Sequence, residues 1–376
     1  MTHYDVIVIG AGGVGSAALY HGAAQGLKIL GIDRFSPPHN HGSSHGQTRI
    51  IRMAYFEHPD YVPLLKQAYA GWKHLEQLSG QQLYHEVGLL EVGPVDGIVI
   101  PGVLRSSKEH DLPLDQFTTH EAQRQFPGFD FPENHTVLFE QQAGYLMVED
   151  CIASYLAAAQ QQGAKLNCEE SLVSWKPHQG EVEVVTDKQT YRCSKLIITT
   201  GAWTSSFTGN CQLPLTLLRK HLYWYRSDSK NYLASQGCPV FFYEDQGRFF
   251  YGFPELQPGT GVKVSEHSGG DPLSDPSVLD PSQNQEDRLA VEAFLKKSLP
   301  QVSRDLVQHA ACMYTMTPDE NFIVDVHPEC ADVVLAAGLS GHGFKFASVL
   351  GQMLIELSAT GNTSLPIDFL SIKRFG

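Results

Sequence analysis

The spacing of three glycines near the start of the chain is the first sign of chemistry. Gly10, Gly12 and Gly15 fit the pattern G-x-G-x-x-G and follow the β-branched run 6–9, which predicts a buried parallel strand. In this pattern the glycines permit a tight turn, a close approach of pyrophosphate and close packing of the next helix. Asp33, about 20 residues further on, can accept a hydrogen bond from a ribose hydroxyl. These features predict a dinucleotide site and leave open whether it takes nicotinamide or flavin.

A polar loop after the second predicted strand carries three histidines, His39, His41 and His45. Histidines suggest a metal, but no carboxylate or cysteine lies nearby at ligand spacing, so we predict no metal site. Arg49 and Arg52 end this loop and are three residues apart, which would place them on one helical face. There they could meet a cofactor or a carboxylate substrate. A solvated basic turn is the alternative.

Two later strands end in small residues that could reach the same ligand. The run 195–203, Lys-Leu-Ile-Ile-Thr-Thr-Gly-Ala-Trp, predicts a buried strand that brings a second stretch of backbone to the nucleotide. The run 333–345 predicts another strand, which ends in Gly-His-Gly before a helix at 346–357. The start of that helix suits an electron-rich group such as a reduced flavin ring. The run 338–342, Gly-Leu-Ser-Gly-His, lacks the last glycine of a hydrolase nucleophile elbow.

Aromatic, strand-rich segments in the second half predict a separate antiparallel sheet. These segments are 219–226 and 240–253. Tyr251, Lys263 and His267 lie on this sheet or just after it. Position alone does not assign chemistry to them, because lysine and histidine near strand ends are usually surface residues.

Composition limits the class of protein. The chain has 376 residues, of which 42% are hydrophobic and 18% charged, as in a globular protein of two or three domains. The net charge of −14, from 41 acids against 27 bases, argues against nucleic acid or an anionic membrane as partner. We expect no secretory leader, because the first strand starts without a basic region and cleavage site, and no apolar run reaches the ~18 residues that a membrane helix needs. The odd number of cysteines, seven, favours reduced thiols and a cytoplasmic protein.

Hydrophobic periodicity predicts the elements that position these residues. Apolar residues at helical spacing predict helices at 61–78, 148–162 and 285–299. Between residues 83 and 144 the period shortens and Pro and Gly become frequent, so we expect the chain to leave the nucleotide domain there and to return near Tyr145.

The chain resembles the monomeric sarcosine oxidase and N-methyltryptophan oxidase family of D-amino-acid-oxidase-like flavoproteins. The resemblance runs from end to end. Besides the glycine turn, it is carried by Gly-Gln-Thr-Arg-Ile-Ile-Arg at 46–52, Tyr-Gly-Phe-Pro at 251–254, Tyr-Thr-Met-Thr-Pro-Asp-Glu at 314–320 and Gly-Leu-Ser-Gly-His-Gly-Phe-Lys-Phe-Ala at 338–347.

The resemblance implies FAD, bound covalently through a thioether between Cys312 and the 8α-methyl group of the flavin. His45 and Arg49 match positions close to the flavin ring, where cations would raise its potential and support covalent attachment. The cofactor-binding residues that we assign are Gly10, Gly12, Gly15, Asp33, Ser43, Thr48, Gly201, Trp203, Cys312, Gly341, Gly343 and Lys345.

The reaction implied is oxidation of a secondary N-methyl amino acid by dioxygen to the amino acid, formaldehyde and hydrogen peroxide. Arg52 and Lys345 match residues that hold the substrate carboxylate. Tyr251, Tyr314 and His267 match the lining that orients the amine. Lys263 matches the base on the far face of the flavin, whose charge favours electron transfer to oxygen. With His45 and Arg49, these last four residues form the catalytic set that we assign.

The resemblance also implies an α/β, two-domain architecture. We predict a Rossmann-like FAD-binding domain from residues 1–84, 145–215 and 318–376. A substrate-binding domain built on an antiparallel sheet would take residues 85–144 and 216–317. We expect a monomer that binds a small N-methyl amino acid and O2.

Alternative functions stay open at this point. They are oxidation of another secondary amine such as pipecolate or proline, a nicotinamide-dependent Rossmann dehydrogenase, and a flavoprotein without catalytic activity.

Overall fold

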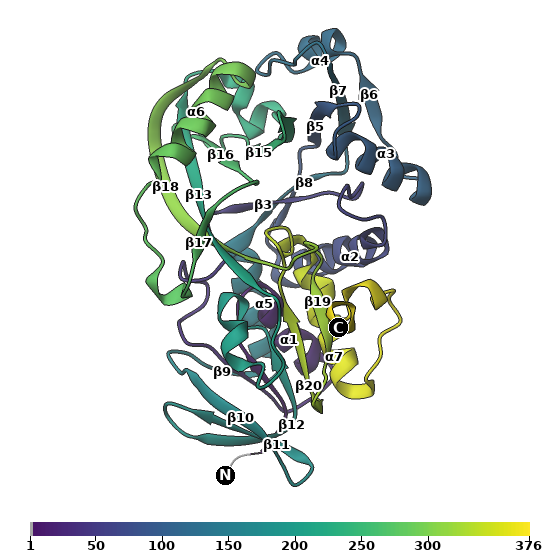
Figure 1. Ribbon diagram of the computed structural model, residues 1–376, viewed down its shortest axis with the longest axis vertical. Helices are drawn as coiled ribbons and strands as arrows, with labels where there is room; N and C mark the ends of the chain where they lie inside the picture. Colours follow the sequence, from purple (N-terminus) through teal and green to yellow (C-terminus); the bar gives the residue numbers. More distant parts are fainter. Residues whose placement is uncertain (1–2) are drawn as a thin grey trace.

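The computed structural model describes residues 3–376, and two large sheets form the two ends of the molecule (Figure 1). In the first sheet the order is β10-β11-β12-β1-β2-β9, and β20 pairs with both β12 and β19. Its strands are β1 (His3–Ile9), β2 (Ile29–Ile32), β9 (Lys165–Asn167), β10 (Leu172–His178), β11 (Glu181–Thr186), β12 (Thr190–Ile198), β19 (Ile323–His327) and β20 (Cys330–Ala337). The central pairs β12–β1, β1–β2, β2–β9 and β12–β20 are parallel, as in a Rossmann-like fold.

Helices α1 (Gly13–Ala24), α2 (Tyr61–Ser79), α5 (Val148–Gln161) and α7 (Ala347–Thr360) share one apolar core with this sheet. The glycine turn joins β1 to α1. A Cβ on Gly15 would lie only 1.8 Å from the carbonyl oxygen of Gly10, so the helix can pack on the strand only with glycine there.

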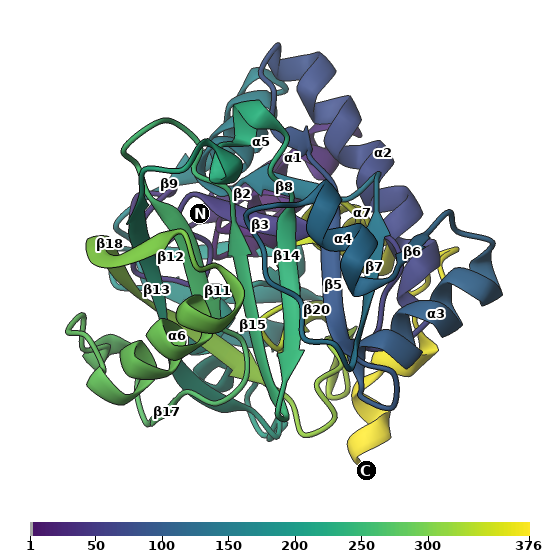
Figure 2. The same ribbon diagram turned by 90° about the horizontal axis from the view of Figure 1, so that it is seen from above.

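The second sheet is mainly antiparallel and has the order β17-β13-β16-β15-β14-β5-β7-β6, with β18 paired to β13. Its strands are β5 (Leu89–Pro94), β6 (Asp115–Phe117), β7 (His135–Glu140), β13 (Thr216–Ser227), β14 (Val240–Asp245), β15 (Arg248–Phe253), β16 (Val262–Glu266), β17 (Asp271–Leu273) and β18 (Val302–Met316). Helices α3 (Val99–His110), α4 (Thr119–Gln125) and α6 (Gln285–Ser298) flank it, as the view from above shows (Figure 2).

A small sheet of β3 (Thr48–Ile51), β8 (Gly144–Met147) and β4 (Tyr84–Glu86) lies between the two large sheets (Figure 1). The prediction that Arg49 and Arg52 share a helical face is wrong. Residues 48–51 pair antiparallel with β8, because a β-branched run finds a partner strand that is distant in sequence. Arg49 therefore belongs to a strand, and Arg52 follows its last residue.

Short 3-10 helices complete the fold. They are η1 (Gly201–Phe207), η2 (Lys230–Tyr232), η3 (Ala234–Gln236), η4 (Pro276–Val278), η5 (Phe344–Phe346), η6 (Asp368–Leu370) and η7 (Ile372–Phe375).

The predicted architecture, a Rossmann-like part joined to a part built on an antiparallel sheet, is confirmed. The predicted helices at 61–78, 148–162, 285–299 and 346–357 correspond to α2, α5, α6 and α7. All strands of the first sheet fall in segments predicted for the FAD-binding domain, and all strands of the second fall in the other segments. The domain boundaries themselves stay a prediction.

Gly15→Ala should destabilise the cofactor-free protein by about 3 kcal/mol or more, because the backbone oxygen of Gly10 cannot turn away from the new methyl group. Gly12→Ala is the matched control: its Cβ would meet no atom within 4 Å, so the change should stay within about 1 kcal/mol. Denaturant unfolding of both variants measures the difference. Equal stabilities would contradict this account of the turn.

Candidate active site

A long cavity extends from the glycine turn to strand β18. It lies at the carboxyl ends of β1 and β2, where open α/β sheets bind their ligands. The predicted cofactor-binding residues that line it are Gly10, Gly12, Asp33, Ser43, Gly201, Trp203, Gly341 and Gly343, together with the predicted catalytic residues Arg49 and Tyr314.

The residues at the start of this cavity fit a dinucleotide. A Cβ on Gly12 would meet no atom within 4 Å, so the backbone there faces open space in which a phosphate fits. Asp33 is buried, and its carboxylate accepts hydrogen bonds from the backbone N–H groups of Ala11, at 2.7 Å, and Phe35, at 2.8 Å. Besides facing the cavity, Asp33 therefore holds the glycine turn in place, a role that the sequence did not indicate.

Cys312 lies on β18, and the two residues that follow it, Met313 and Tyr314, line the cavity. Burial by itself raises the pKa of the Cys312 thiol. The neighbouring His45 side chain and the charge of Arg49 outweigh burial and lower this pKa to about 7. Nη2 of Arg49 lies 3.7 Å from the sulfur. Near neutral pH a large fraction of Cys312 is therefore ionised, and the thiolate is the nucleophilic form of cysteine.

Arg49 reaches Cys312 because β3 presents it to β18. Its Nη2 also donates to the carbonyl oxygen of Ser43 at 2.8 Å, and its Nη1 donates to that of Thr48 at 2.9 Å. His45 is buried beside it, and among the described residues its Nε2 has no hydrogen-bond partner. A buried ring nitrogen without a partner is typical of a site that awaits a ligand.

A second cavity adjoins the first. The two share Arg49, Tyr314, Gly341 and Phe344, and the second is also lined by Arg52, Glu57, Tyr251, His267 and Lys345. A Cβ on Gly341 would lie 2.4 Å from the ring of Tyr314, so glycine lets that ring pack at the boundary. The cofactor and substrate residues predicted separately therefore face one continuous site.

Two buried cations form one end of the second cavity. The guanidinium of Arg52 lies between the rings of Tyr55, at 4.1 Å, and Phe56, at 4.4 Å, and donates to both carboxylate oxygens of Glu57 at 2.7 and 2.8 Å. Lys345 donates to the carbonyl oxygen of His342 at 2.7 Å. Burial and the charge of Arg52 lower the pKa of Lys345 to about 7. The two cations suit a carboxylate, and in this structure the carboxylate bound to Arg52 is that of Glu57.

Glu57 is a residue that the sequence analysis missed. It lies only five positions after Arg52, but no motif or periodicity marks it, and the ion pair depends on how the chain bends after β3. Positive charge on Arg52 lowers the pKa of Glu57 to about 2, although burial opposes this shift.

The rings of Tyr251 and Tyr314 pack near that of His267, with centroids 6.2 and 5.5 Å from it. Nδ1 of His267 and the hydroxyl of Tyr314 are 3.2 Å apart. Burial and the charge of Lys220 lower the pKa of His267 to about 3, so its imidazole is neutral at physiological pH. Burial raises the pKa of both tyrosines, which keep their hydroxyl protons. The group offers neutral hydrogen-bonding partners to a ligand.

Lys263 lies outside both cavity linings, on β16. Its Nζ donates to the carbonyl oxygens of Gly46, at 2.6 Å, and Thr48, at 2.9 Å, and to the Thr48 hydroxyl at 3.2 Å. Burial and the charge of Arg49 lower the pKa of Lys263 well below its ordinary value. Thr48, predicted to bind the cofactor, is thus buried against this lysine and does not line the cavity.

Known proteins match the chain over nearly its whole length. The profile of the family described as FAD dependent oxidoreductase matches residues 5–357. The chain belongs to this family. A monomeric sarcosine oxidase from a Bacillus species is 38% identical over 378 residues, which cover 99% of this chain and 96% of the relative. An N-methyl-L-tryptophan oxidase from Yersinia pestis is 36% identical over 376 residues, which cover 99% of each.

Solved structures agree on the fold. A variant of NikD, an amino acid oxidase essential for nikkomycin biosynthesis, superposes with a TM-score of 0.88 at 24% identity and covers 99% of this chain and 97% of its own. The family and the cavity together identify FAD as the cofactor of this oxidoreductase.

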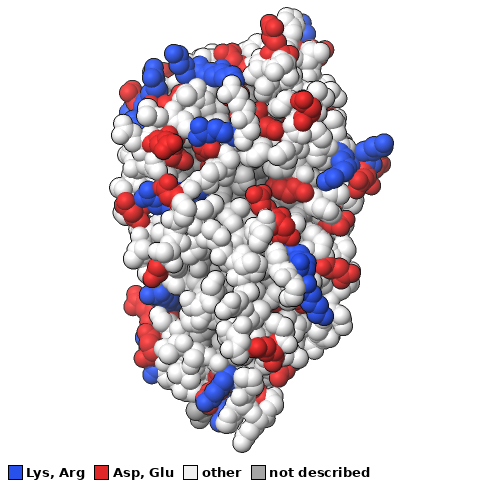
Figure 3. Space-filling view, viewed as in Figure 1, with Lys and Arg blue, Asp and Glu red and all other residues white. Residues whose placement is uncertain are grey.

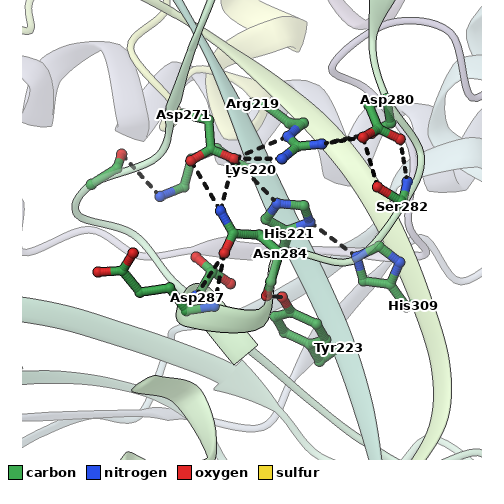
Figure 4. Close-up of polar contacts among 12 residues, drawn as sticks. Arg219, Lys220, His221, Tyr223, Asp271, Asp280, Ser282, Asn284, Asp287 and His309 are labelled. Carbon is green, nitrogen blue, oxygen red and sulfur yellow. Dashed lines mark hydrogen bonds and ion pairs between the residues drawn. The ribbon is translucent and has the colours of Figure 1, made fainter. Parts of the chain in front are cut away.

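Side chains of β13 bind the segment that follows His267, and Figure 4 shows the contacts of Arg219, Lys220 and Asp271. Lys220 donates to the carbonyl oxygens of Ser268, at 2.6 Å, and Gly269, at 3.1 Å. Arg219 donates to Asp271 at 2.6 Å, and Asn284 donates to the same carboxylate at 3.0 Å. These bonds tie the segment after His267 to β13, and His267 itself lines the second cavity.

The charge distribution and two absences further describe the part of the chain that the structure covers. Acidic and basic side chains occur in small mixed groups on the face shown in Figure 3. Within residues 3–376, no helix has the length and apolarity that crossing a bilayer requires. In the same part of the chain, no three His, Cys, Asp or Glu side chains are placed to hold a metal ion.

His45→Ala should raise the pKa of Cys312 by about one unit, because it removes a polar neighbour that favours the thiolate. The ultraviolet absorbance of the thiolate in cofactor-free protein, measured against Cys312→Ser, follows this group. It is selective because burial raises the pKa of other thiols, such as Cys151 and Cys193. His41→Ala, a change at an exposed histidine of the same loop, is the control. Identical titrations of the unmodified protein, His45→Ala and His41→Ala would show that His45 does not act on the sulfur.

Proposed function

We propose that the protein is an FAD-dependent oxidase that demethylates a secondary N-methyl amino acid of the sarcosine or N-methyl-L-tryptophan type. Dioxygen is the electron acceptor, and the products are the amino acid, formaldehyde and hydrogen peroxide. The names of its relatives support this class of reaction. The observation that carries the proposal is the boundary at Tyr314 and Gly341, where a cavity suited to FAD meets a pocket with two buried cations.

When bound, FAD supplies the redox chemistry, and the protein supplies position and charge. Arg52 offers a planar fork and Lys345 a point charge, and together they hold the carboxylate of the substrate. To do so, the carboxylate takes the place that Glu57 occupies on the guanidinium. A substrate held at this end extends its N-methyl group towards Tyr314, on the side of the cofactor cavity.

The amine end of the substrate meets His267, Tyr251 and Tyr314. The neutral imidazole of His267 can accept an N–H hydrogen bond, and it places no positive charge beside the nitrogen that must lose electrons. Lys263 lies beyond the first cavity with its ammonium on the backbone of β3. Its role is to place positive charge where negative charge develops on oxygen.

Cys312 carries the cofactor through a thioether to the 8α-methyl group. The low pKa of this thiol and its place directly before Met313 and Tyr314 support the link. We further propose that the enzyme is a cytoplasmic monomer. Its seven cysteines are all free, as expected in a reducing compartment.

Peroxide formation with a panel of amines tests the function. We expect turnover with sarcosine or N-methyl-L-tryptophan to exceed that with pipecolate and proline. Higher turnover with a cyclic amine would move the assignment to that class, and no peroxide with any secondary amine would contradict the proposal. A colourless protein that binds NADH would support the nicotinamide alternative.

Cys312→Ser should release flavin into the supernatant on acid precipitation, whereas the unmodified protein should keep its yellow colour in the pellet. The reason is that serine cannot form the thioether. Cys330→Ser, on β20, is the control and should retain the flavin. Flavin that stays with the Cys312→Ser pellet would show that another residue carries the link.

A further inference from the structure

Two carboxylates flank the guanidinium of Arg52 on different edges. Glu57 accepts both of its hydrogen bonds from Nη2, whereas Oε1 of Glu91 lies 3.9 Å from Nε. Nη1 donates to the carbonyl oxygen of Ala54 at 3.2 Å. The faces of the guanidinium are covered by aromatic rings, so these edges are the places where its partners can change.

Glu91 is a buried carboxyl group whose Oε1 forms an ion pair with Nε of Arg52 at 3.9 Å. It lies on β5 with 0% of its surface exposed, and among residues 3–376 neither of its carboxyl oxygens has a hydrogen-bond partner. The charged groups that face it are Arg52, Glu140 and Glu57. Glu140 is engaged elsewhere, since it accepts from two backbone N–H groups just after Arg52. Nothing in the proposed reaction uses Glu91, although burying a carboxyl group without hydrogen bonds is unfavourable for folding.

We propose that Glu91 is a positioning residue that controls whether Arg52 is free to bind the carboxylate of the substrate. When protonated, Glu91 is a neutral neighbour and leaves the guanidinium to the substrate. When it loses its proton to solvent, it becomes a second internal counter-ion that competes with the substrate for Arg52. This inference rests on the proposed function, in which Arg52 holds that carboxylate.

The protonation state of Glu91 changes in a useful pH range. Burial raises its pKa to about 8, with Arg52 opposing the shift and Glu140 and Glu57 adding to it. The acid is therefore neutral below that pH and ionised above it. Anion binding to Arg52 should weaken as pH rises through this value. Lys345, whose pKa is about 7, also loses charge in this range, so the contribution of Glu91 must be separated from it.

Binding of methoxyacetate to the holoenzyme makes that separation. This probe has a carboxylate but no ionisable amine, and perturbation of the flavin spectrum reports its Kd. Glu91→Gln keeps the shape of the protonated acid and cannot ionise. We expect the ratio of Kd in unmodified enzyme to Kd in Glu91→Gln to be close to one at about pH 6.5 and about tenfold at about pH 9. Loss of charge on Lys345 weakens methoxyacetate binding equally in both proteins, so its effect cancels from the ratio of the two Kd values.

Glu244→Gln provides the matched control. Glu244 is another buried carboxylate of the same sheet, and it accepts from the N–H groups of Ile98 and Val99 instead of contacting Arg52. The ratio of Kd in unmodified enzyme to Kd in Glu244→Gln should not vary with pH. A ratio for Glu91→Gln that is constant with pH would mean that Glu91 is merely structural and would overturn the proposal.

Failure of the proposed function gives a different result. If methoxyacetate does not bind at any pH, the anion site at Arg52 is wrong, and the role of Glu91 is overturned with it. If the probe binds with the expected pH-dependent ratio but N-methyl amino acids yield no peroxide, the reaction is wrong and the role of Glu91 stands.

Discussion

Positive charge is buried around the two cavities of a protein that is acidic overall. Arg49, Arg52, Lys263 and Lys345 all contribute, and burying a charge is unfavourable unless a partner compensates it. Only Arg52 has a close carboxylate, while the lysines rely mainly on carbonyl oxygens. Burial lowers the pKa of both lysines, and the positive charges of Arg49 and Arg52 lower them further. Buried positive charge of this kind favours anions, and the proposed reaction brings two electron-rich groups, a substrate carboxylate and a reduced flavin.

The fold makes this arrangement possible by giving the cations to different elements. Residues 48–52 run between the two large sheets and bring Arg49 to β18 and Arg52 to the second cavity. Lys263 comes from β16 in the antiparallel sheet, and Lys345 from the turn of 3-10 helix before α7. Each group is held by its own scaffold, so the charges stay close although they repel each other. A hydrogen bond from the backbone N–H of Ala11, in the glycine turn, to Asp33 fixes the other end of the site.

Patterns among neighbouring residues in the sequence predict much of the fold and part of the site. The glycine turn, α2, α5 and α6 were predicted because their patterns depend on neighbours in the chain. The roles of Lys263 and Cys312 came only from family resemblance, since a lone lysine or cysteine carries no pattern. The spacing of Arg49 and Arg52 predicts a helical face, but the segment forms a strand because it pairs with residues almost a hundred positions away. Glu57 and Glu91 were missed for the same reason: their contacts with Arg52 exist only in the folded chain.

A crystal structure of the holoenzyme with a bound N-methyl amino acid analogue tests the central claim most directly. The account predicts that the flavin ring lies in the first cavity beside Tyr314, with continuous density to the sulfur of Cys312. The ligand carboxylate should lie between Arg52 and Lys345, with Glu57 displaced from the guanidinium. A ligand bound elsewhere, with the Arg52–Glu57 ion pair intact, would contradict the account.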